Sequence, residues 1–283
     1  PLGSVEALAV AIRNLFATPL RWSRYDEGGW VFAGHASQLP NPHDYLTVTI
    51  GRQPVVLMRD AGGRLGAFIN SCRHKGAQVC LHARGNRSAH ICPYHSWTYG
   101  SDGRNIAIKA RAAGGYAASF DEESHDLLRV PRFEEYRGFL FVSLAAGGPT
   151  LSEYLGEARV FIDLVVDQSP SGQMEVLPGT QEYDVAANWK LMVENSVDDY
   201  HLPTTHSTWL NFMRNSGVVM EPPKGAGMVL PTKGLAIDLG NGHFTTDNVN
   251  FRGRPVAAWI PLYGEDAKPE MAAIRAAEDE EDE

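Results

Sequence analysis

Two short segments of this chain each combine a cysteine with a histidine, and their side chains could bind metal. Cys72 is followed by His74, and Cys92 is followed by His95. These spacings can place two thiolates on one iron and two neutral imidazoles on the other iron of a [2Fe-2S] cluster. Histidine ligands raise the reduction potential of such a cluster above that of an all-cysteine cluster. The sequence therefore predicts a centre that carries electrons.

Two other interpretations of these four residues are open. A tetrahedral zinc site also uses two cysteines and two histidines. Zinc ribbons usually pair cysteine with cysteine across one turn, however, whereas each turn here mixes the two residue types. The residues could also lie near one another by chance. The agreement of residue type with spacing favours a Rieske-type [2Fe-2S] centre.

The segments around these ligands resemble a known family. The sequences CRHKGA at 72–77 and CPYHSW at 92–97 are similar to the Rieske motif in the large (α) subunits of the aromatic ring-hydroxylating oxygenases. Gly76 would allow a positive φ or a close backbone approach in the first loop. Ser96 stands where the family usually has glycine, so we expect the second loop to be slightly remodelled. Trp97 could shield the cluster from water or belong to the ordinary core.

A second pair of histidines, His201 and His206, follows later in the chain, with Asp198 three residues before His201. On a helix, Asp198 and His201 would face the same side, and Pro203 would bend the chain so that His206 returns toward His201. Two histidines with a carboxylate suit a non-haem Fe(II) site that has open positions for O2 and substrate. From spacing alone, two ordinary surface or core histidines and a carboxylate on the helix surface are the favoured interpretation.

The context of these histidines is similar to the iron-binding segment of the same family. It follows the Rieske motif in the family's order and comprises Asn188-Trp189-Lys190, Glu194-Asn195, Asp198-x-Tyr200-His201 and His206. The resemblance implies that His201 and His206 bind a mononuclear Fe(II). It implies that Asp198 links this site to a Rieske histidine, His95 or His74, of a neighbouring subunit.

The sequence departs from the family pattern at the third iron ligand. The family takes this carboxylate from a late helix, but no Asp or Glu after His206 lies in a matching motif. The candidates considered fall in strand-like or turn-like segments: Asp238, Asp247, Glu265 and Asp266. We therefore expect a catalytic domain that is incomplete at its C-terminal end, or an iron held by two histidines and solvent.

Composition limits the remaining classes. A length of 283 residues suggests two domains, and a net charge of −9 argues against a nucleic-acid partner. The motif uses two of the three cysteines, so Cys80 is expected to be a small buried apolar group. Without a set of disulfides, a reducing cytoplasm is the expected compartment. No apolar run approaches the roughly 18–20 residues that span a bilayer, so no membrane segment is expected.

Hydrophobic patterning predicts an α+β protein. Helical spacing of apolar residues predicts helices at 5–16 and 151–166. Short β-branched and aromatic runs predict strands at 30–33, 45–50, 55–59, 65–70, 88–91, 139–143, 181–185, 234–243 and 257–261. We expect a helical lead-in (5–29), an all-β domain (30–147) ending near Gly147-Gly148-Pro149, a second domain (148–276) and an acidic tail (277–283). The family resemblance implies that the all-β domain is the Rieske domain and that the second is a partial catalytic domain of the helix-grip type.

The resemblance implies the terminal oxygenase component of an aromatic-catabolic system. A ferredoxin and/or reductase, drawing on NAD(P)H, would load the Rieske cluster, and the mononuclear Fe(II) would activate O2. The substrate would be an aromatic compound, cis-dihydroxylated by a dioxygenase rather than a monooxygenase. The family resemblance of residues 238–243 and 254–261 favours an aromatic carboxylate, such as a cumate-like benzoate. A homotrimer or an α3β3 assembly is implied. The alternatives are a Rieske electron-transfer protein without a competent catalytic iron and a zinc-stabilised binding module.

Overall fold

The computed structural model describes residues 29–167, 169, 171–177, 179, 185–198, 201–215 and 235–247. The chain divides into two compact units, residues 20–184 and residues 1–19 with 185–283. The Gly147-Gly148-Pro149 segment lies inside the first of these units. The helix expected at 5–16, the strand expected at 257–261, most of the strand expected at 181–185 and the acidic tail lie outside the described residues.

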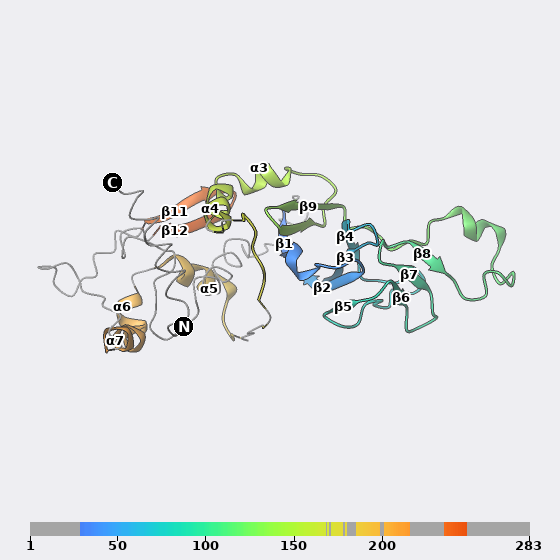
Figure 1. The fold of residues 1–283 in the computed structure, drawn as a ribbon, viewed down its shortest axis with the longest axis horizontal. Helices are drawn as coiled ribbons and strands as arrows, with labels where there is room; N and C mark the ends of the chain where they lie inside the picture. Colours follow the sequence, from blue (N-terminus) through green and yellow to red (C-terminus); the bar gives the residue numbers. More distant parts are fainter. Residues whose placement is uncertain are drawn as a thin grey trace, which may run out of the picture. The chain divides into compact units, whose positions relative to one another are not determined.

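The first unit is built on a four-stranded antiparallel sheet of order β4-β3-β2-β5 (Figure 1). Its strands are β2 (Asp44–Ile50), β3 (Gln53–Arg59), β4 (Leu65–Ile69) and β5 (Arg84–Asn86). The three strands predicted in this region are confirmed. In β3, the four consecutive residues from Val55 to Met58 have no exposed surface, so both faces of this strand are covered, which explains its continuous apolar run.

A second sheet has the order β1-β10-β9 and comprises β1 (Val31–His35), β9 (Arg132–Tyr136) and β10 (Phe139–Ser143). Every residue of β10 is buried, as its apolar sequence predicts. The β9–β10 hairpin turns through Arg137 and Gly138, both at positive φ, which is the backbone of a tight hairpin turn that follows the strand twist. The polar strand β9 was not predicted because its sequence, RFEEY, lacks an apolar alternation.

The third sheet, β6-β7-β8, carries the second cysteine–histidine segment. Its strands are β6 (Ala89–Ile91), β7 (Thr98–Gly100) and β8 (Asn105–Ala107). The turn between β7 and β8 contains Gly103 at φ +81, where a Cβ would lie 2.2 Å from the Phe68 ring. Glycine is therefore required there both by the backbone conformation and by the lack of space.

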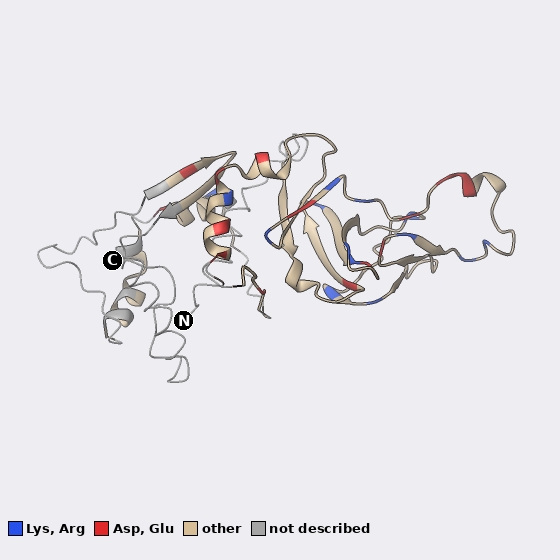
Figure 2. Cartoon of the chain, turned by 45° about the horizontal axis from the view of Figure 1, so that its top comes forward, with Lys and Arg blue, Asp and Glu red and all other residues tan. Residues whose placement is uncertain are grey.

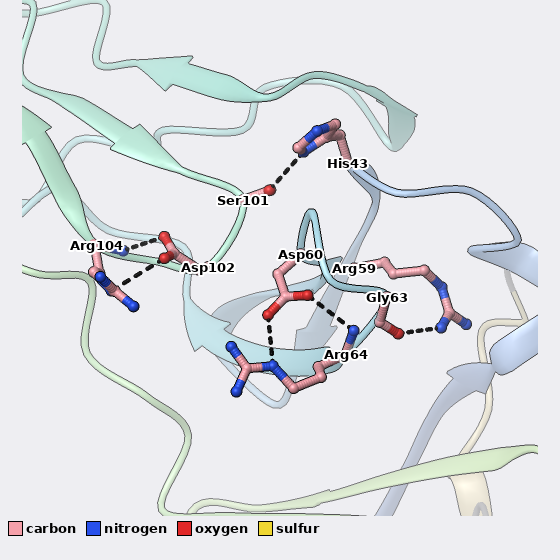
Figure 3. Close-up of polar contacts among 8 residues, drawn as sticks. All are labelled: His43, Arg59, Asp60, Gly63, Arg64, Ser101, Asp102 and Arg104. Atoms are coloured by element: carbon pink, nitrogen blue, oxygen red, sulfur yellow. Dashed lines mark hydrogen bonds and ion pairs between the residues drawn. The ribbon is translucent and has the colours of Figure 1, made fainter.

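Aspartate and arginine fix two neighbouring turns, as Figure 3 shows. Asp60 accepts hydrogen bonds from the backbone N–H and Nε of Arg64, and Asp102 pairs in the same way with Arg104. These turns line a small cavity of about 150 Å³. Both carboxylates are already paired with cations, so the cavity gives no evidence of a site.

The first unit has one short helix after β1 and three helices after the third sheet among its described residues. They are η1 (Ala36–Gln38), η2 (Ala118–Glu122), α3 (Leu151–Leu155) and α4 (Ala158–Val166). Thr150 and Glu153 form a reciprocal capping box at the start of α3. The single helix predicted at 151–166 is wrong, because Gly156 at φ +49 separates α3 from α4. The apolar face nevertheless continues across the break to Ile162 and Val166, both buried.

The second unit contains α5 (Trp189–Val197), α6 (Leu202–Thr205), α7 (Ser207–Asn215) and a hairpin of β11 (Leu235–Gly240) with β12 (His243–Asp247). The hairpin turns at Asn241 and Gly242, both at positive φ, and it confirms the strand predicted from residue 234. His243 is buried in this hairpin. Among the described residues, no helix has the length and apolarity needed to cross a bilayer.

Candidate functional site

The two cysteine–histidine loops of the first unit share the same backbone turn. Each follows a strand end, β4 before Cys72 and β6 before Cys92. The Gly76 N–H donates to the Cys72 carbonyl at 2.9 Å, and the Ser96 N–H donates to the Cys92 carbonyl at 3.0 Å. Gly76 and Ser96 have φ values of +76° and +61°. The predicted positive φ at Gly76 is confirmed, and Ser96 adopts the same conformation instead of remodelling its loop.

These loops bring the four predicted ligands to one place. Cys72 and Cys92 are 3% and 2% exposed and belong to one hydrophobic cluster. The rings of His74 and His95 lie with their centroids 4.5 Å apart. The Nδ1 atoms of both histidines are buried without a hydrogen-bond partner. Buried polar atoms normally have partners, so two unpartnered imidazole nitrogens beside two buried thiols fit a bound metal group.

The protonation state of His74 also suits metal binding. Burial lowers the pKa of this imidazole, and the nearby His95 and Lys75 lower it further. A neutral imidazole is the form that coordinates a metal. His74 is therefore prepared for metal coordination at neutral pH.

The donor set fits two metal ions better than one. A tetrahedral zinc site also uses two thiolates and two imidazoles, but zinc ribbons usually pair cysteine with cysteine across one turn, whereas each loop here supplies one cysteine and one histidine. Two separate ligand pairs are the arrangement that a [2Fe-2S] cluster requires, with two thiolates on one iron and two imidazoles on the other.

Aromatic side chains cover the site. Trp97 is 3% exposed and stacks on His74, with centroids 4.9 Å apart and an interplanar angle of 8°. Its other contacts include the edges of Phe120 and His125. Trp97 therefore shields a predicted ligand from solvent. The exposed Tyr94 lies on the ring of His95, with centroids 3.9 Å apart.

Cys80 is buried, as predicted, but it also makes a polar contact. Its sulfur lies 3.2 Å from Nδ1 of His90. Burial raises the pKa of Cys80 to about 12 and lowers the pKa of His90 to about 4, so the two groups form a neutral pair. Sequence spacing gave no signal for His90, because the contact depends on how β6 packs against the loop that carries Cys80.

The second predicted site lies at the end of α5. The prediction that Asp198 and His201 share a helix is wrong, because α5 ends at Val197 and Asp198 is extended. Even so, Oδ2 of Asp198 lies 3.3 Å from Nδ1 of His201. The short helix α6 begins after His201 and ends before His206, and the two histidine rings lie with centroids 5.2 Å apart. Pro203 lies in the first turn of α6, where proline is tolerated.

A third iron ligand is not found among the described residues near these histidines. Asp238 lies on β11 and accepts a hydrogen bond from the Gly240 N–H. Glu265 and Asp266 lie outside the described residues. His201 and His206 therefore form a candidate pair of ligands, with Asp198 oriented on one of them.

Comparisons with known proteins match the two units to two described families. Residues 29–132 match the Rieske [2Fe-2S] domain, and residues 177–271 match the ring hydroxylating alpha subunit (catalytic domain). The chain is 45% identical over 199 residues to the toluate 1,2-dioxygenase subunit alpha of Pseudomonas putida, a match that covers 69% of this chain and 44% of that protein.

Two further relatives agree. The anthranilate 1,2-dioxygenase large subunit of Acinetobacter baylyi is 43% identical over 208 residues, covering 72% of this chain and 44% of that protein. A solved naphthalene 1,2-dioxygenase from Rhodococcus sp. is 32% identical with a TM-score of 0.60, covering 71% of this chain and 43% of that one. The matched part of the chain therefore spans less than half the length of these relatives.

Proposed function

Because this chain belongs to the α subunits of the Rieske-type ring-hydroxylating oxygenases, we propose that it is the terminal oxygenase component of an aromatic-degrading system. It combines an all-β Rieske domain with part of a ring-hydroxylating catalytic domain. The family implies a [2Fe-2S] cluster and a mononuclear iron. When bound, the cluster supplies single electrons and the iron supplies a position for O2 beside the substrate.

We assign the cluster to Cys72, His74, Cys92 and His95. The support is the two buried, unpartnered Nδ1 atoms of the histidines beside two buried thiols. Trp97 excludes water from one face of His74. Positive φ at Gly76 and Ser96 closes the loops around the cysteines.

We assign the mononuclear iron to His201 and His206. The arrangement of these two histidines with Asp198 is the observation that carries the proposed function. Asp198 accepts a hydrogen bond from Nδ1 of His201, which fixes the tautomer and leaves Nε2 for the metal. The 5.2 Å between the ring centroids allows both imidazoles to reach one ion. As the family implies, the same carboxylate would contact His95 or His74 of a neighbouring subunit in a trimeric assembly, with or without β subunits.

Metal analysis with EPR spectroscopy tests these assignments. The unchanged chain should contain three irons, two acid-labile sulfides and a Rieske-type signal after reduction. A ferrous iron that gives a new signal with nitric oxide should be lost in His201→Ala, whereas the Rieske signal should persist. A Rieske signal without any nitric oxide-responsive iron would support the alternative, an electron-transfer protein. A preparation that contains zinc and gives no Rieske signal would remove both redox functions and support a zinc-stabilised binding module.

We propose an aromatic carboxylate as the substrate. Three relatives carry names of this kind: toluate 1,2-dioxygenase, anthranilate 1,2-dioxygenase and 2-halobenzoate 1,2-dioxygenase. The reaction would be a cis-dihydroxylation. Product analysis with benzoate and naphthalene as paired substrates checks this choice, because naphthalene lacks the carboxylate.

We propose that the electron donor is an acidic redox protein, a ferredoxin or an NAD(P)H-dependent reductase. Although the chain has a net charge of −9, residues 72–111 contain seven lysines and arginines and one aspartate. Figure 2 shows Lys and Arg in blue along the strands and loops of the first unit. Arg73 and Lys75, both exposed, flank His74. Steering by these cations predicts slower cluster reduction by the donor at high salt.

A further inference from the structure

Three aromatic side chains outside the cysteine–histidine loops form a stack beside the cluster site. Tyr116, Phe120 and His125 lie on the segment of residues 109–126, which follows β8 as the green loop in Figure 1. The centroid of the Phe120 ring lies 4.1 Å from that of Tyr116 and 3.9 Å from that of His125, with interplanar angles of 25° and 28°. The three rings are therefore nearly parallel and in contact.

Two rings of this stack meet Trp97 edge to face. The centroids of Phe120 and His125 lie 5.9 Å and 5.4 Å from that of the indole, at interplanar angles of 89° and 67°. The indole in turn lies flat on His74, at 4.9 Å and 8°. His95 contacts the same imidazole at 4.5 Å and 67°. The plane of His74 is therefore set by the indole, and the indole is set by Phe120 and His125.

His125 is held firmly enough to support the indole. Its Nε2 lies 2.8 Å from the carbonyl oxygen of Phe120. A carbonyl can only accept, so Nε2 carries the proton and donates. The next residue, Asp126, accepts a hydrogen bond from the backbone N–H of Asn105 on β8 at 2.7 Å. The stack is thus tied to the sheet that carries the second cysteine–histidine loop.

We propose that Phe120 and His125 are positioning residues, which hold Trp97 flat against His74 and so fix the plane of this imidazole. The inference rests on the proposed function, because it takes His74 as a ligand of the cluster. Groups outside the ligand set commonly orient a metal-bound histidine and thereby tune the metal. Here the orienting contacts are ring contacts, and one aromatic pair of this geometry favours the packed position of the indole by about 2–12-fold.

Two substitutions of His125 separate the ring contact from the hydrogen bond. His125→Phe keeps an aromatic ring against Trp97 but removes the Nε2–H donor. His125→Gln keeps a donor for the Phe120 carbonyl but removes the ring. Pulsed EPR of the reduced, cluster-loaded chain measures the hyperfine couplings of the two ligand histidine nitrogens. Visible absorption measures how fast the cluster is lost in air.

His125→Gln should shift one of the two nitrogen couplings and speed cluster loss by about 2–12-fold, because the indole leaves His74 more often. His125→Phe should retain the couplings and the cluster lifetime of the unchanged chain. Phe120→Leu removes the other supporting ring and should act like His125→Gln, and it supplies the same comparison if His125→Gln binds no cluster. His82→Gln is the control, because His82 is exposed in the same unit, and it should change neither measurement.

Unchanged couplings in His125→Gln would overturn the proposal. Shifted couplings in His125→Phe would also overturn it, because the hydrogen bond, and not the ring, would then be the contact that matters. Each of these outcomes requires a Rieske signal and leaves the proposed function intact. If the unchanged chain gave no Rieske signal, the proposed function would fail and this inference would fail with it, so the two failures are distinguishable.

Discussion

Oδ2 of Asp198 lies 3.3 Å from Nδ1 of His201, although helix α5 ends one residue before the aspartate. Asp198 has an extended backbone and contacts His201, the residue just before α6. The two residues are therefore not one turn apart on a single helix. A carboxylate in this position fixes the imidazole tautomer and its orientation. The arrangement at His201 is consequently sensitive to the charge and shape of one side chain.

Asp198→Asn should therefore reduce substrate turnover by about 10–100-fold, the usual effect of losing the partner of a metal-bound histidine. The amide keeps the volume but loses the charge, and it can present an NH2 group to the imidazole. The measurement is product formation per chain, with the Rieske EPR signal recorded in the same sample. Asp238→Asn, in the same unit, is the control and should retain activity. Full turnover in Asp198→Asn would disprove the role of this carboxylate.

The sequence predicted which residues would gather but not how the backbone gathers them. Cys72, His74, Cys92 and His95 were found because ligand chemistry restricts residue type and spacing, and both loops follow strands that apolar patterning had located. The contact of Asp198 with His201 depends on the point where α5 ends, and helix ends are poorly defined by patterning. The contact of His90 with Cys80 could not be found at all, since it is made only through the packing of β6.

Ser96 predicts a stabilising substitution. It holds φ at +61°, a region that costs an L-residue about 1–2 kcal/mol. Ser96→Gly should raise the free energy of unfolding by about 1 kcal/mol, measured by chemical denaturation of the cluster-loaded protein. Gly76→Ser, at the equivalent position of the first loop, should produce a loss of similar size. Equal stabilities for both variants and the unchanged chain would contradict this reading of the loops.

Replacing Trp97 should affect both the stability of the fold and the lifetime of the cluster, whereas replacing another buried tryptophan should affect stability alone. Trp97→Ala should cost about 3–5 kcal/mol and should also speed the loss of the cluster's visible absorption in air, because the face of His74 becomes exposed. Trp30→Ala removes a tryptophan that is equally buried in the same unit, at 3% exposure, but that contacts Pro149 and Arg132 instead. It should lose stability without faster cluster loss. Similar cluster lifetimes in the two variants would count against shielding by Trp97.

His35 predicts a pH dependence of stability. Burial lowers the pKa of this imidazole below 6.5, and the Arg137 carbonyl opposes the shift. The unfolded chain therefore binds a proton at a higher pH than the folded chain does. Stability contributed by neutral His35 is present above about pH 6.5 and is lost as the pH falls through the folded pKa. Chemical denaturation at several pH values between 5 and 8 measures how the free energy of unfolding changes with pH. His35→Asn keeps a side chain that can cap η1 but cannot titrate, so in this variant the free energy of unfolding should depend less on pH.

A single turnover tests the central claim, that the Rieske domain and the His201–His206 pair act together in one oxygenase. The chain is reduced chemically, separated from reductant, and mixed with 18O2 and benzoate without any electron donor. We expect the Rieske EPR signal to decay together with formation of a dihydrodiol that contains both 18O atoms. In His201→Ala the cluster should stay reduced and no product should form. Decay at the same rate in both proteins, without labelled product, would contradict the account.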